Sequence, residues 1–135
     1  MADLEAVKKF FSADRFAIER CGIEIISAKE GDAVCRMKVT DEHLNAGNVV
    51  QGGAVFTLGD FAYAIAANCG GTLSVTLDNN ISFVAPATGE YLLAHAVERA
   101  SSNRLCFYDV LITNDHGEIV AKMTVTGYKK GTIEF

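Results

Sequence analysis

The sequence predicts an α+β fold in which a curved antiparallel sheet wraps around one long central helix. The segment from Gly52 to Asn68 is rich in alanine, poor in β-branched residues and free of strand-like alternation, which is typical of a helix. From Gly71 onward, apolar and polar residues alternate in several runs, which is typical of strands. The turns between these runs are short, and short connections require antiparallel neighbours.

Length and composition indicate one domain, residues 1–135. Half of the residues are apolar and 21% are charged, and no tract rich in proline or serine indicates a linker or a disordered tail. The net charge of -5 argues against nucleic acid or an anionic membrane surface as the main partner, because both require a basic face. Segment 1–5 carries acids and lacks the apolar core of a signal peptide, so we expect a cytoplasmic protein without a membrane span.

Before the central helix, the sequence predicts one short helix and a hairpin. Apolar residues recur at helical spacing from Leu4 to Phe11, which predicts an amphipathic helix that lies over the sheet. Two extended stretches follow at residues 23–28 and 33–40, with residues 29–32 as the turn between them. Residues 41–47 are expected to form an irregular loop.

The central helix is expected to be covered on most sides, because its apolar side chains leave no solvent face. These side chains are Val55, Phe56, Leu58, Phe61, Ala62, Ile65, Ala66 and Cys69. Gly70 and Gly71 are expected to end the helix, as glycine commonly does at helix C-termini.

Four further strands are expected after the helix. The first alternates from Leu73 through Val75 and Leu77, and the others span residues 91–100, 104–113 and 118–128, separated by turn-rich segments. In the last strand, one side is expected to face the core; its residues are Ile119, Ala121, Met123 and Val125.

Asp60 is the anomaly of the central helix. A lone carboxylate among apolar side chains is costly unless it reaches water or hydrogen-bond donors. The residue is therefore either a structural aspartate satisfied by neighbouring groups or a functional acid. Thr57, Ala64 and Ala67 share its side of the helix and form a lane of small residues, which could admit a slender ligand or a closely packed second helix.

The residues around the start of the same helix offer hydrogen-bond donors. Gly52 and Gly53 leave room for a ligand to approach backbone N–H groups that lack an intrahelical acceptor. Such a pair either polarises a carbonyl oxygen or makes a tight turn. Upstream, the amide of Asn45 either contacts a substrate or water, or makes a local turn bond.

Cysteine and histidine residues give no sign of a disulfide framework or a metal site. The cysteines are widely spaced without a CxxC pair, so we expect reduced thiols at Cys21, Cys35, Cys69 and Cys106. Cys69, at the negative end of the helix dipole, is expected to be a core residue rather than a reactive thiolate. Ligand-like spacing is missing among His43, His95 and His116.

Two segments carry a resemblance to a known family. Residues 43–60, HLNAGNVVQGGAVFTLGD, and residues 80–87, NISFVAPA, resemble the hotdog-fold thioesterases of the phenylacetate-pathway (PaaI-like) group, and the likeness covers nearly the whole chain. The resemblance implies a hotdog fold and hydrolysis of an aryl- or medium-chain acyl-CoA thioester. Coenzyme A is then part of the substrate, and no separate cofactor is expected.

The resemblance also implies roles for five residues. Asp60 matches the family's catalytic acid, acting as general base or nucleophile, and Gly52 matches its oxyanion donor. Asn45 and Thr76 match the family's amide and hydroxyl positions; we expect Thr76 to orient Asp60 or the water, and Asn45 with Gln51 to position water or the thioester. Gln51 stands where many members have histidine, and glutamine cannot carry a proton at neutral pH.

Spacing along the helix predicts an oligomer. Gly52 and Asp60 are eight positions apart, so their backbones lie roughly 12 Å apart along the axis at 1.5 Å per residue. One chain cannot easily bring both to one carbonyl, and a two-fold dimer would create two composite sites. We therefore expect a homodimer, and the resemblance implies that some relatives pair dimers into tetramers.

Three other functions stay open at this point: a non-hydrolytic acyl-CoA binding module, a hotdog dehydratase or hydratase, and a purely structural homo-oligomer. An acid at position 60 favours a hydrolase, whereas a dehydratase is linked to a catalytic histidine that has no counterpart here. We expect four aromatic residues to belong to the core rather than to an acyl pocket: Phe56, Phe61, Phe83 and Phe107. Four basic residues are expected to be solvated surface: Arg104, Lys122, Lys129 and Lys130.

Overall fold

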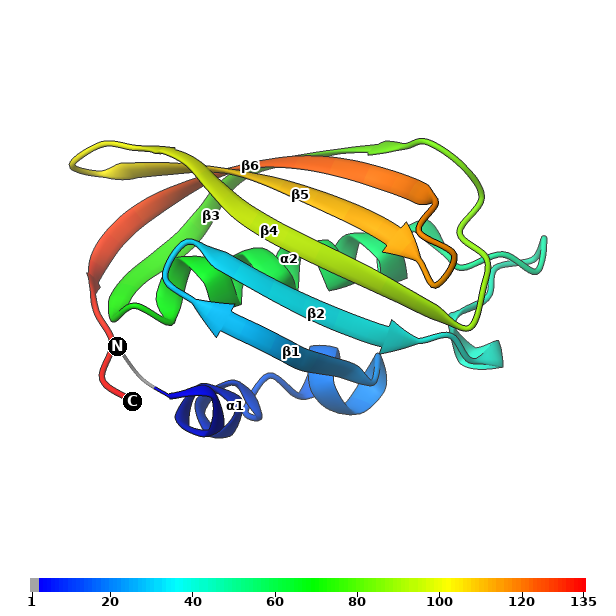
Figure 1. The fold of residues 1–135 in the computed structure, drawn as a ribbon, viewed down its shortest axis with the longest axis horizontal. Helices are drawn as coiled ribbons and strands as arrows, with labels where there is room; N and C mark the ends of the chain where they lie inside the picture. The colour runs from blue at the N-terminus through cyan, green and yellow to red at the C-terminus, as the bar shows by residue number, and fades with distance from the viewer. Residues whose placement is uncertain (1–2) are drawn as a thin grey trace.

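In the computed structural model, which describes residues 3–135, six strands form one antiparallel sheet around a single long helix (Figure 1). The strands are β1 (Ile23–Lys29), β2 (Asp32–Lys38), β3 (Thr72–Phe83), β4 (Tyr91–Ser101), β5 (Leu105–Asn114) and β6 (Ile119–Thr132). Their order across the sheet is β1-β2-β4-β5-β6-β3, so β1 and β3 are the two edges. The predicted α+β fold is confirmed. Met1 and Ala2, part of the acidic N-terminal segment discussed above, lie outside the described residues.

The central helix, α2 (Gly52–Asn68), has the predicted bounds. The side chain of Gln51 caps its start, because Oε1 accepts a hydrogen bond from the Gly53 N–H at 2.6 Å. The chain leaves the helix through Gly71, whose φ of 99° lies in the left-handed region that glycine adopts readily.

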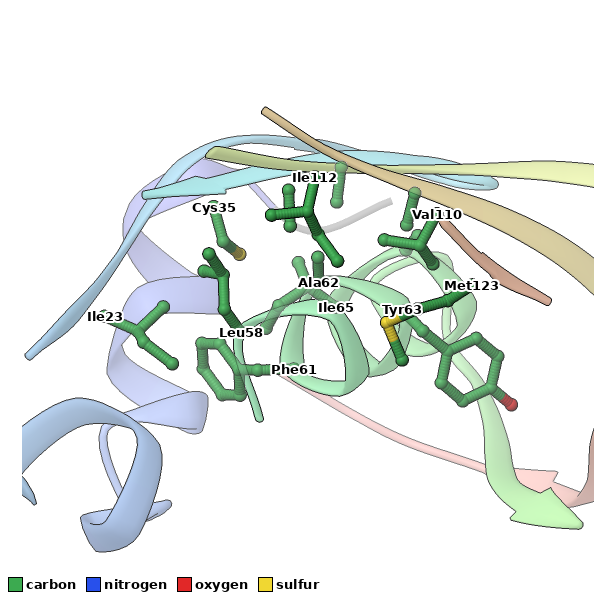
Figure 2. Packing of buried hydrophobic residues seen from close by; sticks show 14 of the residues in the cluster. Ile23, Cys35, Leu58, Phe61, Ala62, Tyr63, Ile65, Val110, Ile112 and Met123 are labelled. Atoms are coloured by element: carbon green, nitrogen blue, oxygen red, sulfur yellow. The ribbon is translucent and has the colours of Figure 1, made fainter. Parts of the chain in front are cut away.

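The core lies between α2 and the sheet. Figure 2 shows Ala62 and Ile65 of α2 facing Ile112 of β5, and all three side chains are fully buried. Helix and sheet approach each other closely at Gly59, where an added Cβ would collide with the sulfur of Met123. A side chain at position 59 would therefore require the Met123 side chain, and the Ile112 side chain beside it, to move.

The N-terminal helix, α1 (Leu4–Phe11), also has the predicted bounds. It packs beside the edge strand β1 (Figure 1). It reaches α2 through an edge-to-face contact between Phe11 and Phe61, whose ring centroids are 6.0 Å apart. A π-helical turn, η1 (Phe16–Arg20), follows, and the sequence did not predict it. The predicted loop at residues 41–47 contains a short 3-10 turn, η2 (Asp41–His43).

The predicted inward side of β6 is wrong at its first residue. Ile119 is 44% exposed, whereas Ala121, Met123 and Val125 are buried as expected. The pairing of β5 with β6 is irregular there, so Val120 turns into the core instead. A period-two pattern does not predict such an irregularity.

Strand β3 differs from the other strands because its polar side faces α2. The N–H of Ser74 donates to Asn68 Oδ1 of α2 at 2.7 Å, which ties the start of the strand to the end of the helix. On the opposite side, Val75 is 41% exposed and Leu77 is 59% exposed. Within residues 3–135, the polar side chains of Thr76 and Asn79 on β3 reach the lane of small residues on α2 at Asp60.

All four cysteines are free and buried, and the predicted core position of Cys69 is confirmed. Burial raises the pKa of the thiols of Cys21 and Cys69, and raises that of Cys35 to about 12. Within residues 3–135, no helix is both long enough and apolar enough to cross a membrane.

Candidate active site

Asp60 sits in the middle of α2 and turns toward the polar side of β3. One carboxylate oxygen, Oδ1, accepts hydrogen bonds from Thr76 Oγ1 at 3.3 Å and from Asn79 Nδ2 at 3.2 Å. The other oxygen, Oδ2, receives no hydrogen bond from any described residue. The carboxylate is thus anchored through one oxygen and left with a free acceptor on the other.

The environment of Asp60 makes it a stronger base than an ordinary aspartate. Burial raises the pKa of its carboxyl, and the negative charge of Asp14 adds to this rise. The hydrogen bonds from Asn79 and Thr76 act in the opposite direction, because they stabilise the ionised form. Carboxyls with raised pKa values are frequent among general bases.

The first turn of α2 presents one backbone donor without an acceptor. The N–H of Gly53 is bonded to the Gln51 side chain, and the N–H groups of Ala54 and Val55 reach the Gln51 carbonyl at 2.9 and 3.2 Å. The N–H of Gly52 has no acceptor among residues 3–135. It therefore stands free at the positive end of the helix dipole, where a partial negative charge is stabilised.

A cavity of about 470 Å³ is lined in part by Gly52. Asn45 supplies its one polar side chain, and its lining consists of Asn45, Val49, Val50, Gly52, Val55 and residues 83–87. The ring of Phe83 stands directly over Gly52, since a Cβ added there would lie 3.0 Å from Phe83 Cζ. An apolar cavity beside a free N–H suits an apolar group attached to a carbonyl.

The expectation that four aromatic residues are core residues is wrong for two of them. Phe61 is buried, and Phe56 packs against the core. Phe83 is 55% exposed and lines the cavity, and Phe107 is 38% exposed. Phe83 closes an edge strand, where one of its sides faces away from the core.

Asn45 and Gln51 both make local hydrogen bonds. Oδ1 of Asn45 accepts from the N–H groups of Gly47 at 2.8 Å and Val49 at 3.3 Å, which is the local turn arrangement considered above. Oε1 of Gln51 caps α2. Their amide nitrogens make no hydrogen bond within the part of the chain that the structure describes, so each retains donors at the cavity end of the helix.

The five predicted site residues therefore fall into two groups. Asn45, Gln51 and Gly52 gather at the start of α2, whereas Asp60 and Thr76 meet at its middle. Asn79 was missed, because a regular strand would turn it away from the face that carries Thr76.

Residues 3–135 contain no group of three or more His, Cys, Asp or Glu side chains that could hold a metal ion. Both ring nitrogens of the buried His43 are engaged within the chain: Nδ1 accepts from the Thr40 N–H at 3.1 Å, and Nε2 lies 2.9 Å from the Cys21 carbonyl oxygen.

Comparison with known protein families decides the class. Residues 47–121 match the family model described as "Thioesterase superfamily", a stretch that includes both Gly52 and Asp60. The chain belongs to the thioesterase superfamily. The predicted enzyme class, a thioester hydrolase, is thereby confirmed.

Two curated relatives of this thioesterase superfamily member carry names that state an activity. It is 39% identical over 101 residues to acyl-coenzyme A thioesterase PaaI of Escherichia coli, covering 74% of this chain and 72% of the relative. It is 33% identical over 122 residues to human acyl-coenzyme A thioesterase 13, covering 87% of each.

Solved structures support the same assignment. The Escherichia coli PaaI protein from the phenylacetic acid degradation operon superimposes with a TM-score of 0.84 at 30% identity, covering 98% of this chain and 100% of that one. A hypothetical thioesterase protein of Streptococcus pneumoniae, solved with coenzyme A, superimposes with a TM-score of 0.85 at 27% identity, covering 94% and 99%. The predicted hotdog fold and the resemblance to the PaaI-like group are confirmed.

Proposed function

We propose that this thioesterase hydrolyses an aryl- or medium-chain acyl-CoA thioester to the free acid and coenzyme A. The observation that carries the proposal is the free N–H of Gly52, at the positive end of α2 and next to an apolar cavity. The names of the two curated relatives, and the coenzyme A bound to the Streptococcus pneumoniae protein, support the substrate class.

Gly52 is proposed to stabilise the charge that develops on the thioester oxygen. A backbone N–H with no competing acceptor does not need to break a bond before it binds the oxyanion. The dipole of α2 adds to the stabilisation of that charge. Asn45 and Gln51, with free amide nitrogens at the same end, are proposed to position the thioester or the attacking water.

Asp60 is proposed either to deprotonate the attacking water as a general base or to attack the acyl carbon itself as a nucleophile. Its free Oδ2 supplies the acceptor that either role requires, and its raised pKa suits proton abstraction. Thr76, which holds Oδ1, is proposed to orient the carboxylate.

The site is proposed to be shared between two copies of the chain. Gly52 lines the cavity, while Asp60 lies eight residues further along α2, roughly 12 Å along the axis. Beside Asp60, the edge strand β3 pairs on one side with β6 and presents the exposed apolar side chains of Val75 and Leu77. A second copy that docks on this edge is proposed to bring its Gly52 to Asp60 of the first.

Release of free coenzyme A tests the activity. The wild type and Asp60→Asn are incubated with a panel of aryl-acyl and aliphatic acyl-CoA thioesters, and binding is measured in parallel by calorimetry. We expect turnover by the wild type and its collapse in Asp60→Asn while binding persists. Tight binding without wild-type turnover would contradict hydrolysis and favour a non-hydrolytic binding module.

A mixture of two inactive variants tests whether the site is shared. Asp60→Asn and Gly52→Pro subunits are co-expressed, so that half of the dimers pair one of each. Each mixed dimer has one intact site of two, so about a quarter of the wild-type activity is expected to return. A mixture as inactive as its components would place Gly52 and Asp60 of one site in the same chain.

A further inference from the structure

The sequence neighbours of Thr76 on β3 do not follow the alternation of a regular strand. Thr76 pairs with Gly127 of β6 and Asp78 pairs with Thr126, so Leu77 is an extra residue with no partner on β6. This is a β-bulge, which changes the side to which the following side chains point. Asn79 then pairs with the buried Val125 and faces α2, as Thr76 does.

The bulge therefore brings two donors, three residues apart, to one carboxylate oxygen. In a regular strand, residues three apart point to opposite faces, and only one of them would reach Asp60. Here Thr76 Oγ1 and Asn79 Nδ2 both donate to Oδ1 of Asp60, at 3.3 and 3.2 Å. Leu77, the extra residue, points outward and is 59% exposed.

When the amide nitrogen of Asn79 donates to Asp60, the amide oxygen is left without a hydrogen bond. Its oxygen is buried and has no partner among the described residues. Flipping the amide would place that oxygen against the Asp60 carboxylate, where two acceptors repel each other. A buried acceptor without a donor costs free energy, so the orientation of Asn79 is set by the charge on Asp60.

We propose that Asn79 is a positioning residue for the hydrolytic reaction, aimed by the bulge at Leu77 so that it holds Oδ1 of Asp60 and leaves Oδ2 free to act. The inference rests on the proposed role of Asp60. Asn79 acts through the carboxylate and touches no substrate. The Asn79 hydrogen bond also favours the ionised form of Asp60, whereas burial of the carboxyl and the negative charge of Asp14 favour its neutral form. Tyr63 is the titratable neighbour of Asp60 on α2.

The test compares Asn79→Leu, which keeps the size of the side chain and removes the donor, with Asn80→Leu as the matched control. Asn80 is the same residue type one position along β3, and it lines a groove on the outer face with Lys122 and Thr124. The same substitution is therefore made on the same strand, on opposite faces.

Two kinetic results are expected for Asn79→Leu. Loss of a hydrogen bond to a charged group lowers kcat about 10- to 100-fold, with KM unchanged because the residue does not contact the substrate. The acid limb of kcat/KM moves to higher pH, because the remaining surroundings of Asp60 favour its neutral form. Asn80→Leu leaves both unchanged, and Asn79→Gln, which retains an amide donor, recovers part of kcat.

A direct titration separates failure of this inference from failure of the proposed function. The Asp60 carboxyl is followed by ¹³C NMR in the wild type and in Asn79→Leu, with Asp60→Asn used to assign the signal. A rise in its pKa in Asn79→Leu supports the positioning role even if no acyl-CoA is cleaved. An unchanged pKa together with an unchanged kcat would overturn it, as would a loss of melting temperature alone.

Discussion

The two polar regions of α2 differ in the chemical groups that they contain: uncharged hydrogen-bond donors in one and a carboxylate in the other. At the start of the helix the available donors are the backbone N–H of Gly52 and the amides of Asn45 and Gln51, none of which titrates near neutral pH. At its middle there is a partly buried carboxylate, held by two side chains of β3. The first region can bind charge at any pH, whereas the second can accept a proton only when it is ionised.

The two regions should therefore respond differently to substitution. Substitutions at the middle of α2 should alter the pH dependence of the reaction, because they act on an ionisable group. Substitutions at its start that introduce no ionisable group should lower the rate without moving the pH profile, because they act on a fixed dipole.

The largest effect is expected for Asp60→Asn. Loss of the proton acceptor should lower kcat about 100- to 10,000-fold. Because the folded-state pKa is raised, the native protein binds a proton more tightly than the unfolded chain, and its stability falls as pH rises from the ordinary aspartate pKa through the folded value. The uncharged asparagine avoids this loss, so its melting temperature at neutral pH should equal or exceed that of the wild type. A clear drop at neutral pH would show that the aspartate is structural.

Gly52→Pro should give the next largest loss. Proline removes the N–H and suits the first helical position, and Gln51, with φ -61° and ψ 136°, already has the backbone conformation that precedes proline. Loss of one oxyanion donor should lower kcat about 100- to 1000-fold, with an unchanged pH profile.

Gly52→Ala is the control for this substitution. Alanine retains the N–H but brings a Cβ against Phe83, as proline does. Steady-state kinetics of both variants therefore separate the effect of losing the N–H donor from the effect of crowding the Phe83 ring. Equal losses in the two variants would mean that Gly52 serves only to leave room for the Phe83 ring.

Gln51→Glu should separate stability from activity at the start of α2. The carboxylate can still cap Gly53, and a negative charge at a helix N-terminus typically stabilises by about 0.3–1 kcal/mol. The same charge opposes the oxyanion beside it, so kcat should fall about tenfold. Thermal unfolding and turnover are measured on one preparation; a parallel fall of both would contradict the separation.

Thr76→Val should give the smallest effect of the series. Its hydroxyl is exposed and donates at 3.3 Å, and a typical hydrogen bond contributes about 0.5–1.5 kcal/mol, so kcat should fall about two- to tenfold. The acid limb of the pH profile should move upward, as expected for the middle of the helix. A fall without that movement would place Thr76 with the water or the thioester instead.

The sequence predicted the approximate bounds of α2 because the limits of this helix are local. The alanine-rich run allows no strand, and the Gly70-Gly71 pair directly after the Cys69 C-cap marks the end of the helix. The role of Asn79 is not local, because the bulge at Leu77 exists only in the pairing of β3 with β6. Ile119 escaped prediction for the same reason, since the irregular pairing at the start of β6 decides which residue turns inward.

The exposure of Phe83 escaped prediction for a different reason. A hydrophobicity pattern assigns this apolar side chain to the core. Its exposure follows from the position of β3 at the edge of the sheet. The order of the strands is a property of the whole chain, and a single strand does not reveal it.

The four buried thiols give this protein a built-in reporter. A disulfide reagent that detects free coenzyme A attacks thiolates, and burial keeps Cys21, Cys35 and Cys69 protonated and out of reach while the chain is folded. In the native protein the signal therefore comes from the released product. When the chain unfolds, its own sulfurs become reactive, so one reagent distinguishes an inactive variant that is folded from one that has lost its structure.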